Sequence, residues 1–465
     1  MRISMKRLTR RRAGATAAGL LAAGTVAVLV VPVGSATADV PGPGEGMLCE
    51  ASVAAHPDTD PPLFDLEATS GYVTTPDGNS VYMWSYTASG RSFQLPGPTL
   101  CVTSGQTVTV VLHNTLREAT SIVFPGQPDP TEQPSAGAVQ PAQPELDAGG
   151  AVVSLVRSAP AGGGSVTYTF TAGSPGTYLY HSGTDVAKQR EMGLYGALVV
   201  RPAGYDAGSP ATRLANDDRT SAFSKEFLYL VSQIDPDYHA AVERNRAANI
   251  ETTVARYFLI NGRSMPDTLA PNNAAWLPAQ PYGALIHITA DPLPGSALPK
   301  HSPALIRYVN AGPVNYPFHP HGSSQFVITR DGAAQHDAAG HDATYGKFLI
   351  DIGPGQSVDT LESWGMEYDP TANPIPTDIQ LPQLQDQIVG PGTETWFSEN
   401  PYLGGAQGDV PTNIVQNNMC GEYYHVAHSH ALYQATNFGA SFGGMMTLIR
   451  IDPPNLFNCV AGDYS

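Results

Sequence analysis

Basic side chains are scarce in this sequence. Lysine and arginine number 24, against 41 aspartate and glutamate residues, and the formal net charge at pH 7 is −17. A surface with this excess of negative charge repels nucleic acid and anionic membranes. We therefore expect no nucleic-acid partner. The charge either attracts cations or serves solubility.

Cysteine is also scarce. None of the four residues forms a C-x-x-C pair, the spacing found in many zinc and redox sites. In an exported chain, scattered cysteines predict two disulfides. Three pairings are open, of which Cys420 with Cys459 would tie down the C-terminal tail. The four residues are Cys49, Cys101, Cys420 and Cys459.

Long apolar runs are absent after the first 33 residues. Residues 13–33 are apolar, follow a run of basic residues, and are followed by Ala36-Thr37-Ala38, which resembles a cleavage site. We expect a signal peptide over residues 1–38, with the adjacent arginines pointing to the twin-arginine route, and a secreted or periplasmic protein. A membrane anchor is the alternative, but glycines and Pro32 interrupt the run. No other segment approaches the roughly 20 residues of a membrane span.

Amphipathic helical periodicity is nearly absent as well. Instead, 47 glycines and 41 prolines separate short runs rich in Val, Ile, Thr, Tyr and Phe, a pattern typical of all-β sandwiches. The runs repeat in two cycles of similar order. We expect domains over residues 39–205 and 223–465, a linker at 206–222, one helix near 237–246, and long surface inserts at 125–150 and 364–418.

Nucleophile elbows and phosphate-binding loops are missing, whereas two H-x-H pairs are present. They are His319 with His321 and His428 with His430, each beside a predicted strand. Alternate residues of a strand point to one face, so each pair places two imidazoles side by side. Imidazole is a good ligand for transition metals. His181, at the end of a strand in the first domain, is the fifth candidate metal ligand.

With their flanking residues these histidines resemble the copper motifs of multicopper oxidases. Residues 316–322, Y-P-F-H-P-H-G, are similar to H-P-x-H-x-H-G, and residues 428–434 with Met445 and Met446 are similar to H-C-H-x3-H followed by Met. Tyr180-His181-Ser182-Gly183 resembles an H-x-H of the early domain. The H-x-H-G of that domain would fall at residues 123–126, V-F-P-G. The resemblance implies an all-β fold of two Greek-key cupredoxin-like β-sandwich domains.

The resemblance also implies altered copper sites. Tyr316, Ser429 and Gln434 stand where the family has the His, Cys and His ligands of the type 1 copper, and such side chains do not make a blue-copper site. Carried over by position, His321 and His428 would hold one type 3 copper, His181 and His430 the other, and His319 the type 2 copper. Two imidazoles per metal at most imply one or two copper ions, not three.

Two functions follow from these residues. The first is a copper-dependent oxidoreductase acting on phenols or metal ions with dioxygen, as the family implies. The alternative is a non-catalytic exported cupredoxin scaffold or binding protein, in which the histidines are hydrogen-bonded relics. The resemblance also implies a homotrimer in which His181 meets the other four histidines across chains. His336, His341 and His425 are expected to be solvated.

Overall fold

Short runs of β-branched and aromatic residues form strands along most of the described chain. The computed structural model describes residues 44–56, 60–209, 212–291, 302–322, 324–364 and 423–452. The predicted signal segment, the insert after Trp364, and Cys420 and Cys459 lie outside these ranges.

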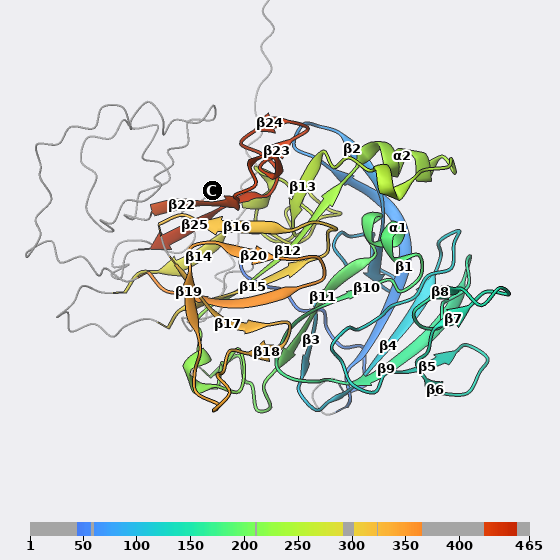
Figure 1. Ribbon diagram of the computed structural model, residues 1–465, viewed down its shortest axis with the longest axis horizontal. Coiled ribbons are helices and arrows are strands. Elements are labelled where there is room, and N and C mark those ends of the chain that lie inside the picture. The colour runs from blue at the N-terminus through green and yellow to red at the C-terminus, as the bar shows by residue number, and fades with distance from the viewer. Residues whose placement is uncertain are drawn as a thin grey trace, which may run out of the picture. The chain divides into compact units, whose positions relative to one another are not determined.

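The first group of strands forms a sandwich of two sheets (Figure 1). In order across the larger sheet, its strands are β2 Ser80–Ala88, β1 Leu63–Thr74, β4 Thr107–Asn114, β9 Gly164–Thr171, β5 Thr131–Pro134 and β6 Gln140–Pro141. The smaller sheet contains β10 Gly176–His181, β11 Tyr195–Arg201 and β3 Leu100–Thr103. A separate hairpin pairs β7 Glu145–Leu146 with β8 Val152–Ser154.

The second group forms a second sandwich. The path of its larger sheet runs through β18 Ala333–Ala334, β17 Gln325–Arg330, β21 Ser357–Glu362, β15 Ala304–Asn310, β12 Glu226–Ile234, β13 Tyr257–Ile260, β23 Thr436–Asn437 and β24 Ala440–Ser441, with β19 Tyr345–Lys347 beside β17. The smaller sheet runs through β14 Ile286–Thr289, β25 Met446–Asp452, β22 Tyr423–Ser429, β16 Tyr316–Pro320 and β20 Ile350–Ile352.

The two sandwiches repeat the same strand pairing. In the first, β1 is parallel to β4 and β3 is parallel to β11. In the second, β12 is parallel to β15 and β14 is parallel to β25. The expected all-β class with two Greek-key cupredoxin-like sandwiches is confirmed. The domain boundaries at 205 and 223 stay a prediction.

Two α-helices lie among the described residues, α1 Val186–Glu191 and α2 Pro236–Glu243. The sequence around residue 237 predicted α2. Its start follows from local chemistry, because the Asp235 carboxylate accepts from the backbone N–H of Asp237 and Tyr238, and Pro236 occupies the first turn. No described helix is long and apolar enough to cross a membrane.

Apolar packing joins the two sandwiches. Each has its own buried core, and a third buried cluster takes Met83, Leu95 and Leu179 from the first sandwich and Leu230 and Leu259 from the second. In addition, α2 follows the second sandwich's β12, but its Tyr238 packs into the core of the first.

A buried ionic network reinforces this contact. The Arg307 guanidinium on β15 lies 2.5 Å from Glu226 and 3.0 Å from Asp359, and it also donates to the Thr177 hydroxyl of the first sandwich at 2.9 Å. Glu226 accepts two further hydrogen bonds from Arg201, at 2.7 and 2.6 Å. The two carboxylates therefore have charged partners within the interior.

One of the two expected disulfides lies in the described residues. Cys49 is bonded to Cys101, which attaches the N-terminal segment to β3. The first predicted insert, residues 125–150, is ordered around β5, β6 and β7 rather than being wholly irregular.

Candidate metal centre

Two neighbouring strands bring four of the five candidate histidines together. β22 lies between β25 and β16 in the sheet, and His319 of β16 is the direct register partner of His428. Because side chains alternate along a strand, His321 lies on the same face as His319, and His430 on the same face as His428. The quartet, defined as His319, His321, His428 and His430, thus follows from strand register.

The quartet rings are in mutual contact. The ring centroids of His319 lie 4.7 Å from His321, 5.9 Å from His428 and 5.4 Å from His430. The centroids of His321 and His428 are 5.0 Å apart. His428 is buried, His319 and His321 are half-buried and His430 is exposed, so the quartet lies at the surface of the second sandwich.

Backbone carbonyls fix the orientation of two of these rings. The Nδ1 atom of His428 lies 2.8 Å from the carbonyl oxygen of Ser429, and that of His319 lies 2.6 Å from the carbonyl oxygen of Phe348. A carbonyl only accepts, so in both rings Nδ1 carries the proton and Nε2 keeps its lone pair. Metal-binding histidines are commonly oriented in this way.

Burial keeps the inner rings uncharged. Burial, together with repulsion from the neighbouring imidazoles of His428, His319 and His430, lowers the pKa of His321 to about 4. Burial also lowers the pKa of His428. Both rings are therefore neutral at pH 7, which is the form that binds a metal ion.

Two imidazoles already have the spacing of ligands to one ion. Their Nε2 atoms, in His321 and His428, are 2.9 Å apart, and two nitrogens bound to one metal at about 2.0 Å and a right angle lie about 3 Å apart. Within the described ranges, no group of three or more His, Cys, Asp or Glu side chains is gathered tightly enough to hold an ion. The donors therefore fit a copper ion held by two imidazoles, with His319 and His430 beside it.

The residues at the type 1 positions are fully buried. Ser429 and Tyr316 lie on the strand faces opposite the quartet, and Gln434 lies in the 3-10 helix Leu432–Gln434 that follows β22. The Ser429 hydroxyl donates to the Gln434 side-chain oxygen at 2.5 Å, and the Gln434 amide donates to the Tyr433 hydroxyl at 2.9 Å. The Tyr316 hydroxyl donates to Gln233 at 3.1 Å. Here the polar side chains satisfy one another inside the protein.

His181 lies apart from the quartet, with no described contact to any of its members. It ends β10, where its backbone pairs with Val123, the first residue of the V-F-P-G segment. Its Nδ1 lies 2.8 Å from the carbonyl oxygen of Ser182. Burial lowers the pKa of His181 to about 4, and the Arg190 charge contributes to the shift. Its role as a metal ligand stays a prediction.

The expectation for His425 is wrong. Its side chain is fully buried rather than solvated, because the Trp364 ring stacks on it with centroids 4.4 Å apart. His336 and His341 lie at the surface as expected, paired with Asp218 and Asp337. Sequence reasoning also missed Phe348, whose carbonyl meets His319 only because β20 pairs with β16.

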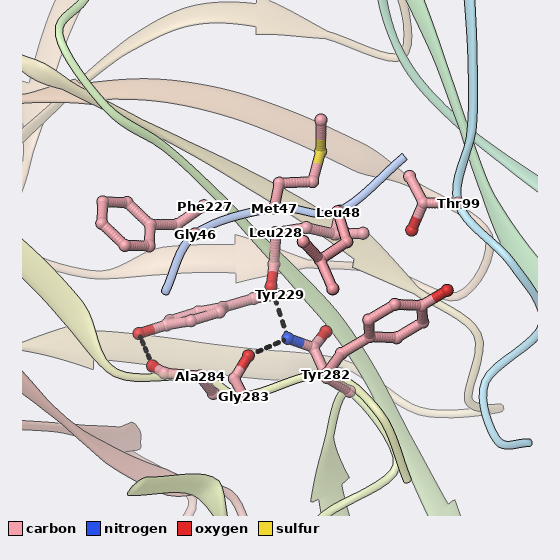
Figure 2. A pocket seen from close by; sticks show the side chains of 11 residues that line it. Gly46, Met47, Leu48, Thr99, Phe227, Leu228, Tyr229, Tyr282, Gly283 and Ala284 are labelled. Atoms are coloured by element: carbon pink, nitrogen blue, oxygen red, sulfur yellow. Dashed lines mark hydrogen bonds between the residues drawn. The ribbon is translucent and has the colours of Figure 1, made fainter. Parts of the chain in front are cut away.

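A small cavity between the N-terminal segment and β12 is no substrate site. Figure 2 shows the Tyr229 hydroxyl donating to the Ala284 carbonyl, at 2.8 Å, beside a space of about 10 Å³. The Asn261 amide donates to the carbonyls of Leu228 and Gly283. Such a space holds at most one water molecule.

One family profile matches the sequence of the first sandwich. The profile of the family described as multicopper oxidase matches residues 74–204. The first sandwich is thus similar to a multicopper oxidase domain over these residues. The matched segment contains His181 and the V-F-P-G segment, and the quartet lies after it.

Curated relatives share the same part of the chain. An L-ascorbate oxidase of Cucurbita maxima is 34% identical over 113 residues, 24% of this chain and 17% of the relative. A multicopper oxidase of Cercospora beticola is 36% identical over 107 residues, 23% of this chain and 14% of the relative. The match thus spans less than a fifth of either relative.

Solved multicopper oxidases share the fold over most of the chain. The blue copper oxidase from Nitrosomonas europaea aligns with a TM-score of 0.52 and 17% identity, covering 84% of this chain and 85% of that one. The multicopper oxidase mgLAC aligns with a TM-score of 0.50 and 17% identity, covering 86% and 88%. These likenesses establish the cupredoxin-type fold.

Proposed function

We propose that this protein is a copper-binding oxidoreductase whose copper is held by the quartet. The observation that carries the proposal is the pair of facing Nε2 atoms of His321 and His428, 2.9 Å apart on neutral rings. Copper, when bound, supplies one-electron redox chemistry. The protein's part is to orient the imidazoles, which the Ser429 and Phe348 carbonyls do through Nδ1 of His428 and His319.

One or two copper ions, but not three, are proposed per chain. Four imidazoles supply at most two ligands to each of two ions, so water completes the coordination. A type 1 copper is not part of the proposal, because Ser429, Gln434 and Tyr316 are buried and engaged in hydrogen bonds. A reductant would then meet the quartet directly at the surface, where His430 is exposed.

The proposed substrates are phenols or metal ions, with dioxygen as the electron acceptor. The names of the curated relatives, L-ascorbate oxidase and multicopper oxidase, support an oxidase activity. Export to a secreted or periplasmic location is also proposed, supported by the Cys49–Cys101 disulfide, since such bonds persist in oxidising compartments. His181 would join the centre only from a neighbouring copy in a homotrimer, and it is left out of the proposed ligand set.

Metal analysis and electron spin resonance of the copper-reconstituted protein test this proposal. We expect one or two Cu(II) ions per chain without an intense thiolate-to-copper absorption. The His321→Gln and His428→Gln variants should lose most of the bound copper, because each removes one of the two facing nitrogens. His341→Gln, at an exposed histidine paired with Asp337, is the matched control and should keep full copper content.

A wild-type protein that stays metal-free after reconstitution would contradict the copper proposal and favour the non-catalytic binding protein. An intense thiolate-to-copper band would contradict the altered type 1 site. Copper-dependent oxygen uptake that persists in a His428→Gln/His430→Gln double variant would place the redox centre elsewhere.

A further inference from the structure

A second pocket, of about 230 Å³, opens in the first sandwich beside His181. Val123, Phe124 and Pro125 of the V-F-P-G segment form part of its wall. Of its eleven lining residues, only His181 and Tyr168 carry a polar side-chain atom. The quartet contributes nothing to this pocket.

Aromatic rings form the floor of the pocket. Phe124 lies 4.6 Å from Phe170 between ring centroids, and 6.4 Å from Tyr168 in an edge-to-face arrangement. The Tyr168 hydroxyl donates to the Arg157 carbonyl at 2.6 Å, so this polar atom is already satisfied. Three aromatic rings therefore line the pocket, and each is more than nine-tenths buried.

The insert after residue 125 forms the rim and is held in place by buried polar contacts. Pro130 and Ala142 belong to this insert, and Leu155 belongs to the segment after β8. The Glu132 carboxylate accepts from the backbone N–H of Arg157 at 2.7 Å and from the Gln140 amide at 2.9 Å. These bonds tie the insert to itself and to the segment after β8, so the pocket is preformed.

His181 supplies the pocket with one hydrogen-bond acceptor. Its Nδ1 faces the Ser182 carbonyl at 2.8 Å, and a carbonyl cannot donate, so Nδ1 carries the proton and Nε2 presents a lone pair. No hydrogen bond of the described residues reaches Nε2. The lining residues include no cationic side chain that would pair with an anion.

We propose that this pocket binds a small single-ring aromatic molecule carrying one O–H or N–H donor, with its ring on Phe124 and Phe170 and its donor on His181 Nε2. Apolar cavities of this size admit benzene-sized molecules, and one fixed polar group selects among ligands of equal shape. The inference does not rest on copper at the quartet, because no quartet residue lines the pocket.

Binding of phenol and of fluorobenzene to the metal-free full-length protein tests the proposal. Fluorobenzene matches phenol in size but has no donor. Wild type should bind both saturably and prefer phenol by about tenfold, the worth of one neutral hydrogen bond. His181→Phe should abolish this preference, and Ala142→Trp at the rim should block both ligands while sparing the core.

Equal affinity for the two probes in wild type, or binding unchanged in Ala142→Trp, would overturn the pocket assignment. Copper content of the same variants separates this inference from the proposed function. If His181→Phe lowered the copper bound per chain, His181 would be a metal ligand and the organic ligand would be rejected. If all variants kept their copper while phenol selectivity vanished in His181→Phe, the inference would be supported.

Discussion

At the scale of single residues, the two faces of β22 have different chemistry. His428 faces the other quartet rings, whereas Ser429, next along the strand, points into the protein and bonds to Gln434. A strand makes this separation unavoidable, because successive side chains point to opposite faces. One face can thus keep metal ligands while the other becomes an ordinary polar interior.

The Ser429→Ala substitution tests whether that interior is structural. It removes the donor to the buried Gln434 oxygen, which is then left without its partner. The free energy of unfolding should fall by about 1–3 kcal/mol, while copper content stays that of wild type. Urea denaturation and metal analysis measure the two effects. Ser441→Ala, at an exposed serine of β24, should change neither, and loss of copper in Ser429→Ala would show that the two faces are coupled.

At the scale of elements, the strands with regular local sequence could be predicted and their long-range partners could not. The runs of aromatic and β-branched residues at 176–181 and 304–310 coincide with β10 and β15, and the run at 257–262 extends two residues beyond β13, because alternation and β-branched content are local. Helix α1 was missed because its six residues are too few to show a helical period.

The same limit applies to the candidate site. The H-x-H pattern predicted that His319 and His321 share a face, and register with β22 completes the quartet. The separation of His181 could not be predicted, since it depends on how β10 is placed in the other sandwich. Likewise, burial of His425 depends on Trp364, which is 61 residues away in sequence and packs on it only in the fold.

The Arg307→Met substitution tests the link between β10, β15 and β21. It leaves Asp359 buried without its cationic partner, and breaking a buried pair in this way should cost about 3–5 kcal/mol of unfolding free energy at pH 7. Arg91→Met, at an exposed arginine 3.5 Å from Glu50, is the control and should cost no more than about 1 kcal/mol. Urea denaturation gives both values, and equal losses would contradict the structural role of the network.

The cost of Arg307→Met should depend on pH. Burial raises the pKa of Glu226, but the charges of Arg201 and Arg307 outweigh it, so the pKa lies below its usual value of 4.5. A carboxyl group whose pKa is lower in the folded state stabilises the protein at pH values above its unfolded-state pKa. This stabilisation is lost as the pH falls through the folded-state pKa. The difference in unfolding free energy between wild type and Arg307→Met should therefore become smaller below about pH 4.5. A constant difference down to pH 3 would be inconsistent with this account.

At the scale of the whole molecule, the two sandwiches should unfold together. They share a buried apolar cluster and the Arg307 network, and α2 places Tyr238 of the second half in the core of the first. Scanning calorimetry should show one transition. Leu230→Ala, in the shared cluster, should lower its midpoint without splitting it, at a cost of about 2–5 kcal/mol.

Leu432→Ala is the matched control for this measurement, because Leu432 is 69% exposed and its truncation should leave the transition nearly unchanged. Two resolved transitions in wild type would mean that the shared cluster is too weak to couple the sandwiches. A split that appears only in Leu230→Ala would locate the coupling in the cluster itself.

The pocket beside His181 has walls of two origins. Phe124 and Phe170 belong to the core of the first sandwich, whereas Pro130 and Ala142 flank β5 and β6, the strands that end the larger sheet at one edge. Substitutions at Pro130 or Ala142 should therefore change which molecule is accepted with less effect on the folding free energy than substitutions at Phe124 or Phe170. Related chains can therefore differ in the ligand that they accept while keeping a similar fold stability.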